Sequence, residues 1–142
     1  MSANLQGVRR VFCDSSFFYS CLDSRDVCHE RAKELATQAA EAGTILSSTW
    51  DVFSQTVTLL RYRRGYQLAI RFLDDFKPML DIVVYDHSVR SGAEQIFRRY
   101  GVERRLSYCD AISFVVVTTM LDGIPCLSFD QDFRALGLTV LG

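Results

Sequence analysis

The hydrophobic positions of the chain fall into short runs that alternate with longer segments of helical periodicity. Short apolar or β-branched runs occur along the whole length, at residues 8–13, 44–46, 82–85, 125–129 and 138–141. Runs of this length with little polar interruption are typical of strands buried on both faces of a sheet. The pattern therefore predicts about five strands, separated by segments long enough to hold helices.

The segments between these runs carry the periodicity and the end signals of helices. Residues 26–42 are polar and alanine-rich, and Gly43 follows where a helix would stop. Further helices are predicted from a cap at 48 or 49 to about 64, and over 66–76, 89–100 and 107–121. The last has a β-prone stretch at 115–119, but its length and apolar spacing favour a buried helix.

Strands that alternate with helices predict an α/β fold in three layers, with a central, mostly parallel sheet and helices on both faces. The length of 142 residues fits a single domain over residues 1–142. In such sheets ligands bind outside the carboxyl ends of the strands. The residues that follow each strand are therefore the first candidates for a functional site.

Composition excludes several classes of protein. Sixteen basic and seventeen acidic residues give a net charge of −1, which excludes a histone-like basic coat. The five cysteines are an odd number without a C-x-x-C pair, so reduced thiols are expected in place of a zinc site or disulfide framework. The most apolar stretch, residues 111–121, is too short to cross a bilayer, and no signal-peptide pattern is present. We expect a cytoplasmic protein that does not bind membranes.

Three aspartates stand at the predicted strand ends or at a helix start. Asp14 follows the first strand, Asp130 follows the fourth, and Asp110 lies early in the helix over 107–121. Taken singly, each could cap a helix or turn, or favour the positive end of a helix. Gathered at one edge of a sheet, they would repel each other unless a cation lay among them. Clustered carboxylate oxygens suit Mg²⁺ or Mn²⁺, which can activate water and stabilise charge on a phosphodiester.

The blocks around these aspartates resemble the signature blocks of PIN domains, most closely those of the VapC-type toxin ribonucleases. The matching blocks are residues 11–16, 106–114 and 127–133, in the family's order. The resemblance extends over essentially the whole chain. It implies a metal-dependent endoribonuclease fold that is commonly dimeric and commonly inhibited by a small antitoxin protein.

The resemblance also implies roles for individual residues. Asp14 and Asp110 match the principal metal ligands of the family, and Asp130 matches its later acid. Ser16 matches a hydroxyl that supports the site beside the first aspartate. The corresponding expectations are an RNA substrate, Mg²⁺ or Mn²⁺ as cofactor, an antitoxin partner and a homodimer.

The chain departs from the family pattern at one position. Where the family has a Glu, the alignment places Gln55, which has the same length but no charge. Asp51 lies one helical turn earlier and could replace the missing carboxylate, although a first-turn acid favoured by the helix dipole explains it better. With one carboxylate fewer, we expect weaker metal binding and lower activity.

Arginines dominate the basic residues and gather in two stretches. Fourteen of the sixteen basic residues are Arg, and nine of these lie within residues 61–71 and 90–105. The candidates for RNA contacts are Arg98, Arg99, Arg104 and Arg105, because Arg binds phosphate through a planar fork of donors. A solvated, salt-bridged helix surface is an equally good interpretation.

Residues and resemblance together predict a Mg²⁺-dependent endoribonuclease of the VapC type, which hydrolyses RNA with a metal-activated water. Asp14, Asp110 and Asp130 would hold the ion, and Gln55 and Ser16 would complete the catalytic site. A first alternative is a PIN module, weakened by Gln55, that binds RNA or a protein. A second is a phosphatase-like hydrolase with Asp14 as nucleophile, which is disfavoured because Ser16 stands where a second Asp is required.

Overall fold

The apolar runs predicted as strands form one five-stranded sheet in the computed structural model, which describes residues 5–142. The strands are β1 (Arg10–Cys13), β2 (Ile45–Ser48), β3 (Leu80–Ile82), β4 (Cys126–Leu127) and β5 (Val140–Leu141). Their order across the sheet is β3-β2-β1-β4-β5, and every neighbouring pair is parallel. The prediction of an α/β architecture around a parallel sheet of about five strands is confirmed.

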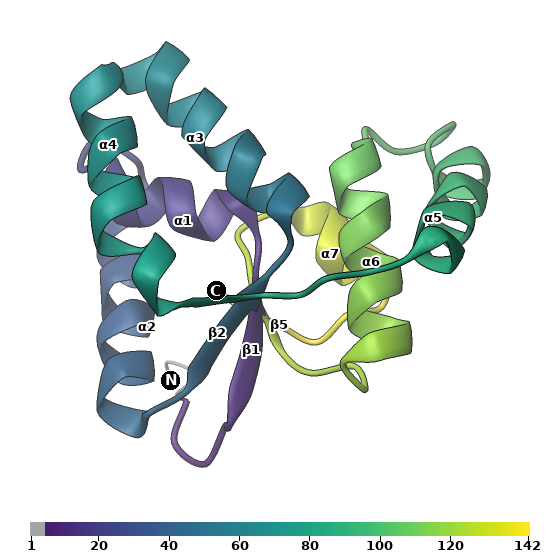
Figure 1. The fold of residues 1–142 in the computed structure, drawn as a ribbon, viewed down its shortest axis with the longest axis horizontal. Coiled ribbons are helices and arrows are strands. Elements are labelled where there is room, and N and C mark those ends of the chain that lie inside the picture. Colours follow the sequence, from purple (N-terminus) through teal and green to yellow (C-terminus); the bar gives the residue numbers. More distant parts are fainter. Residues whose placement is uncertain (1–4) are drawn as a thin grey trace.

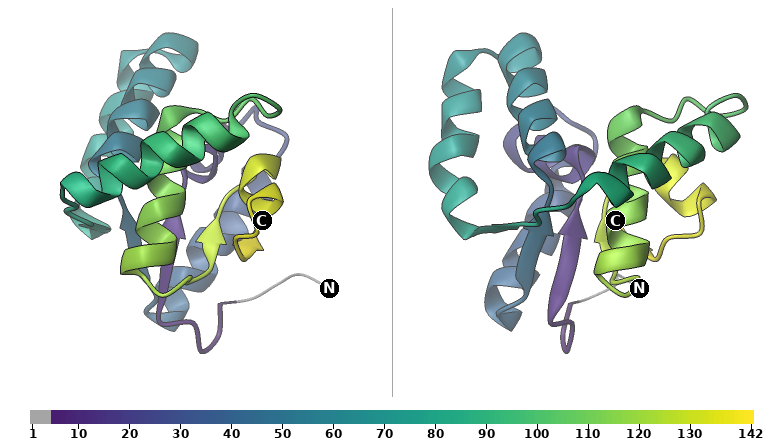
Figure 2. Two further views of the ribbon diagram at one scale, coloured as in Figure 1. Left: turned by 90° about the vertical axis from the view of Figure 1, so that its right-hand side faces the viewer. Right: turned by 45° about the vertical axis from the view of Figure 1, so that its right-hand side comes forward.

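Helices form a layer on each face of this sheet (Figures 1 and 2). One layer holds α1 (Ser15–Leu22), α2 (His29–Ala42), α3 (Trp50–Arg64) and α4 (Tyr66–Asp75), followed by the 3₁₀ turn η1 (Lys77–Met79). The other layer holds α5 (His87–Tyr100), α6 (Tyr108–Met120) and α7 (Gln131–Ala135). Within residues 5–142, no helix is long and apolar enough to cross a membrane.

Aromatic side chains fill the space between the sheet and the first layer. Phe12 of β1, Phe18 of α1 and Phe72 of α4 are fully buried. The rings of Phe18 and Phe72 lie 5.2 Å apart and are tilted by 57°. Full burial of a side chain of this size contributes about 1.5–3 kcal/mol to stability. This packing anchors α1, and with it the chain that leaves β1.

The second layer is built on α6, which is helical as its apolar spacing predicts. Val116 and Val117 are fully buried. α5 packs closely against α6 at Gly92, where an added Cβ would lie 3.3 Å from Cγ1 of Val115. The β-prone valines therefore serve as the buried face of a helix, since tertiary packing outweighs their local preference.

β3 begins and ends earlier than the apolar run predicts. The prediction covers residues 82–85, whereas the paired residues run from Leu80 to Ile82. After the Val83 N–H donates to the carbonyl oxygen of Ser48 at 2.8 Å, the chain leaves the sheet, and Val84 is 84% exposed. The departure is needed because α5 belongs to the opposite layer.

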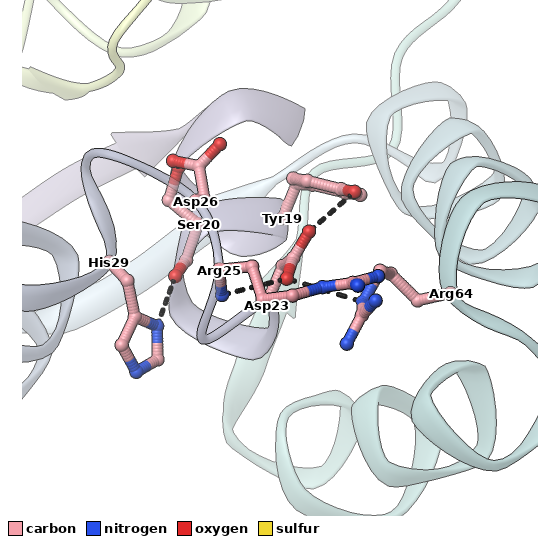
Figure 3. Close-up of polar contacts among 7 residues, drawn as sticks. All are labelled: Tyr19, Ser20, Asp23, Arg25, Asp26, His29 and Arg64. Atoms are coloured by element: carbon pink, nitrogen blue, oxygen red, sulfur yellow. Dashed lines mark hydrogen bonds and ion pairs between the residues drawn. The ribbon is translucent and has the colours of Figure 1, made fainter.

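The loop between α1 and α2 is held by polar contacts (Figure 3). The Asp23 carboxylate accepts a hydrogen bond from the Tyr19 hydroxyl at 2.8 Å, and its Oδ1 lies 3.2 Å from Nε of Arg64. The Asp26 carboxylate accepts a hydrogen bond from the Ser20 hydroxyl at 2.8 Å. Because residues 23–26 belong to this loop, α2 starts three residues later than predicted, at residue 29.

Candidate active site

The carboxyl ends of β1 and β4 lie side by side at the centre of the sheet, where the chain turns to opposite layers. β1 leads into α1 in one layer, and β4 leads into α7 in the other (Figure 1). A divergence of this kind opens a crevice beyond the strand ends, where α/β proteins bind ligands. Asp14 directly follows β1 and Asp130 follows β4, so both lie at this crevice.

The structure brings the three predicted aspartates together at the crevice. Carboxylate oxygens of Asp14, Asp110 and Asp130 all lie within 4.8 Å of one another. Asp110 comes from the first turn of α6. Asp14 is only 1% exposed and Asp110 6% exposed, whereas Asp130 is half-buried. Three carboxylates at this separation repel each other unless protons or a cation offset their charge.

One carboxylate oxygen of Asp14 accepts two hydrogen bonds, and the other has no hydrogen-bond partner within residues 5–142. Oδ2 of Asp14 accepts from the hydroxyl of Ser16 at 2.9 Å and from that of Ser128 at 3.0 Å. The Ser16 oxygen in turn accepts from the Phe129 N–H at 2.9 Å, which ties α1 to the segment after β4. Oδ1 of Asp14 is buried and has no hydrogen-bond partner among residues 5–142. An unpaired buried acceptor costs about 1–3 kcal/mol, so this oxygen fits a bound cation.

One oxygen of Asp110 and one oxygen of Asp130 also accept backbone hydrogen bonds. Oδ2 of Asp110 accepts from the Ser107 N–H at 3.2 Å, as part of the capping box that starts α6. Oδ1 of Asp130 accepts from the Asp132 N–H at 2.9 Å, which caps α7. Both residues are thus helix caps and members of the cluster at once. The Asp14 side chain forms no cap hydrogen bond with α1.

Ser128 is a part of the site that the sequence did not single out. It is 1% exposed, and besides donating to Asp14 its oxygen accepts from the Asp130 N–H at 3.0 Å. It therefore links two members of the cluster. The sequence signal that could have identified Ser128 is its position two residues before Asp130, within the third block.

The pKa values of the buried acids reflect this crowding. Burial raises the pKa of Asp14, while hydrogen bonds from Ser16 and Ser128 oppose the rise. Burial, followed by the charge of Asp14, raises the pKa of Asp110 to about 7. A positive ion between the carboxylates would favour their charged forms. The bare oxygen of Asp14 and the hard oxygen donors together fit a divalent cation.

Comparison with known proteins agrees with this geometry. The family model of the PIN domain matches residues 11–138. This chain belongs to the PIN-domain family. A VapC ribonuclease of Archaeoglobus fulgidus is 29% identical over 123 residues, which cover 84% of this chain and 76% of that relative.

Solved structures include a similar PIN fold. The crystal structure of Mycobacterium tuberculosis VapC20, described as a sarcin–ricin loop cleaving toxin, matches with a TM-score of 0.78 and 27% sequence identity. The match covers 91% of this chain and 96% of that chain. The resemblance drawn from the three sequence blocks is therefore confirmed.

Gln55 of this PIN domain lies in a recess beside the acids. The recess has a volume of about 430 Å³ and is lined from α3 by Trp50, Asp51 and Gln55 and from α6 by Tyr108 and Cys109. Oε1 of Gln55 is buried and has no hydrogen-bond partner in the described part of the chain. A neutral, unpaired acceptor therefore lies in this recess.

Asp51 lines the same recess as Gln55 but does not belong to the acidic cluster. Its Oδ2 accepts a hydrogen bond from the Tyr85 hydroxyl at 2.6 Å. Among residues 5–142, the acids whose oxygens converge are Asp14, Asp110 and Asp130, without Asp51. Asp51 is therefore a first-turn acid of α3 that accepts from Tyr85 and is not among the converging acids.

The four arginines predicted to contact RNA are exposed. Arg98 and Arg99 lie in the last turn of α5, and Arg104 and Arg105 lie in the loop before α6. None of them forms an ion pair within residues 5–142, so a salt-bridged surface is not observed. Arg98 lines a cavity of about 480 Å³ together with Tyr108, which also lines the Gln55 recess.

Proposed function

We propose that this PIN domain is a metal-dependent endoribonuclease of the VapC type. The observation that carries the proposal is the convergence of three carboxylates, with a buried and unpaired oxygen on Asp14 within the described chain. The similarity to a VapC ribonuclease and to a toxin that cleaves the sarcin–ricin loop supports RNA as the substrate.

Asp14, Asp110 and Asp130 would hold Mg²⁺ or Mn²⁺, since these ions bind a few carboxylates and keep several waters. When bound, such an ion supplies a water-derived nucleophile and offsets the charge that develops on the phosphodiester. Ser16 and Ser128 orient Asp14 through its Oδ2. The Ser107 N–H orients Asp110 in the same way.

The VapC-type proposal includes a small antitoxin partner, a homodimer and a cytoplasmic location. Apolar surface that could contact a protein is present on the second layer. Val102 is 87% exposed, and Phe97 and Tyr108 are about 40% exposed beside the cavity that Arg98 lines.

Purified protein incubated with single-stranded and structured RNAs tests the function. We expect cleavage with Mg²⁺ or Mn²⁺, and none with a chelator. Asp14→Asn should abolish the ion-dependent cleavage, because it removes a charge from the cluster while an oxygen remains for Ser16 and Ser128. Asp74→Asn, an exposed acid on α4, is the matched control and should cleave normally. Equal cleavage by Asp14→Asn and the parent would refute the proposal.

The neutral Gln55 favours one other function, the binding of RNA or a protein without cleavage. Such a module would bind RNA equally well with the ion or the chelator. It would also leave every RNA intact with either ion. The same incubation therefore separates the two functions.

A further inference from the structure

A cavity of about 310 Å³ opens directly onto the acids. Its walls include Asp14, Asp26 and Asp130, so three carboxylates face it. Among the described residues that line it, Arg63 of α3 is the one Arg or Lys. A polyanion that enters this cavity meets strong repulsion except where an ion or Arg63 offsets it.

Helical periodicity places Arg63 on the face of α3 that borders the candidate active site. Leu59 lines the same cavity, and Gln55 lines the neighbouring recess beside Cys109. Residues four apart share one face of a helix, so positions 55, 59 and 63 form one row about 12 Å long. Arg63 therefore stands two turns beyond Gln55 along a single edge of the candidate active site.

The guanidinium of Arg63 lies over the ring of Tyr19. Cζ of Arg63 lies 5.4 Å from the centroid of the Tyr19 ring. The Tyr19 hydroxyl donates to Asp23, and Asp23 is paired with Arg64 (Figure 3). The charge of Arg64 is thus neutralised inside the fold. Arg63 has no ion pair within residues 5–142, so its charge is available to a ligand.

We propose that Arg63 binds a phosphate of the RNA substrate next to the scissile phosphate, and that Tyr19 is the positioning residue for its guanidinium. The inference rests on the proposed ribonuclease function. A guanidinium presents paired N–H donors that match phosphate oxygens, and a ring beneath it limits its motion before binding. Within residues 5–142 Asp26 forms no ion pair with Arg63, and its Oδ2 accepts from the Ser20 hydroxyl and the Cys28 N–H.

Arg61 provides a matched control on the same helix. It is exposed, and its Cζ lies 5.6 Å from the centroid of the Tyr66 ring, but it does not line the acid cavity. Arg61→Ala and Arg63→Ala therefore remove the same charge and the same kind of ring contact. They differ in whether the arginine faces the acids.

Binding is measured with a fluorescent single-stranded RNA in chelator over a range of salt concentrations, and cleavage is measured separately in Mn²⁺. Arg63→Ala should weaken binding about 10- to 100-fold and reduce the slope of log K against log salt by about 0.7. It should raise KM more than it lowers kcat, since the contact is already made before the transition state. Arg61→Ala should stay within about twofold of the parent, because its guanidinium lies outside the cavity. Arg63→Lys should recover part of the affinity.

The role of Tyr19 is tested by a double-mutant cycle. Tyr19→Leu removes the ring beneath the guanidinium together with the hydrogen bond to Asp23, so it should weaken RNA binding in the parent and have no further effect in Arg63→Ala. Tyr19→Phe keeps the ring and should stay closer to the parent in RNA binding. If the two losses add in full, Tyr19 does not act through Arg63.

The possible failures are distinguishable. RNA binding that depends on Arg63, without cleavage in any ion, would overturn the ribonuclease proposal and leave the phosphate contact standing. Cleavage with equal affinity, KM and salt slope for Arg63→Ala and Arg61→Ala would overturn the Arg63 inference. Melting curves check that each variant folds, and Arg63→Gln replaces Arg63→Ala if the latter does not.

Discussion

At the scale of single residues, the neutral side chain of Gln55 keeps the negative charge of the candidate site lower than a carboxylate at this position would. Its buried Oε1 has no hydrogen-bond partner within residues 5–142, and it lies in the recess that Cys109 shares. An amide can offer an oxygen to an ion or to a water, but it contributes no negative charge. A fourth carboxylate would help to bind a divalent ion and to deprotonate the attacking water.

Gln55→Glu is nearly isosteric and therefore tests charge with little change in packing. We expect the variant to bind Mn²⁺ more tightly and to cleave RNA faster than the parent. Without the ion it should be about 1–3 kcal/mol less stable, because a buried charge is added near acids that already repel each other. Paired melting curves and cleavage assays, each with and without Mn²⁺, measure both effects. Gln67→Glu, an exposed position on α4, is the control. If Mn²⁺ changed neither the melting temperature nor the cleavage rate of Gln55→Glu relative to the parent, the side chain at position 55 would not face the acids.

At the scale of elements, α5 brings one arginine, Arg98, to a cavity and holds a second, Arg99, beside it in its last turn. Arg98 and Arg99 occupy its last turn, where a cation also interacts favourably with the helix dipole. Their positions alone would therefore be explained by helix stability. The cavity that Arg98 shares with Tyr108 connects Arg98 with α6, the helix that carries Asp110, and this favours a contact of Arg98 with substrate.

The double substitution of Arg98 and Arg99 by Ala should weaken RNA binding and lower the salt slope by about 1.4, since two phosphate contacts are lost. RNA titrations at several salt concentrations measure both quantities. Arg71→Ala with Lys77→Ala removes two charges from α4 and η1 and should change the slope less. Unchanged affinity and slope for the α5 variant would make its arginines a solvated surface.

The elements also show which parts of the fold local sequence can predict. The helix α6 is recognisable because its apolar spacing places Val116 and Val117 on a buried face. The bounds of β3 cannot be recognised in this way, because Val84 has the β-branched side chain typical of a strand but is exposed. Whether a valine pairs with β2 depends on where the chain must leave the sheet, which no local pattern contains.

The candidate site likewise has parts that local sequence predicts and parts that it does not. Asp14, Asp110 and Asp130 could be named from three short blocks, but their convergence depends on β1 lying beside β4, a contact between distant segments. The contribution of Arg63 could not be predicted, because it depends on Tyr19 and on the loop after α1.

At the scale of the whole molecule, the crowded acids make folding depend on pH. Burial raises the pKa of Asp14 and raises that of Asp110 from 3.8 to about 7. Over that interval the folded state therefore binds more protons than the unfolded state. The contribution of these two acids to stability therefore decreases as pH rises toward the pKa of about 7 of Asp110.

We expect the protein in chelator to be more stable to urea at about pH 5 than at about pH 8. Mn²⁺ should restore stability at the higher pH by mass action on the folded state. Urea unfolding at the two pH values, with and without Mn²⁺, is the measurement. Asp110→Asn keeps an oxygen for the Ser107 N–H but cannot ionise, so its unfolding should depend less on pH. An unchanged pH dependence in this variant would show that Asp110 is not the group responsible.

In the proposed metal site, the hydrogen bonds to the three aspartates would also favour binding of the ion through one oxygen of each carboxylate. Each carboxylate already uses one oxygen, for Ser16 and Ser128, for the Ser107 N–H, or for the Asp132 N–H. Each can therefore give an ion a single oxygen without losing a contact that holds the fold. Ca²⁺ takes six to eight oxygens and often binds carboxylates through both, whereas Mg²⁺ accepts a few single oxygens and completes its shell with water. If the proposed site holds an ion, serines and backbone amides that touch no metal would thus favour Mg²⁺ over Ca²⁺.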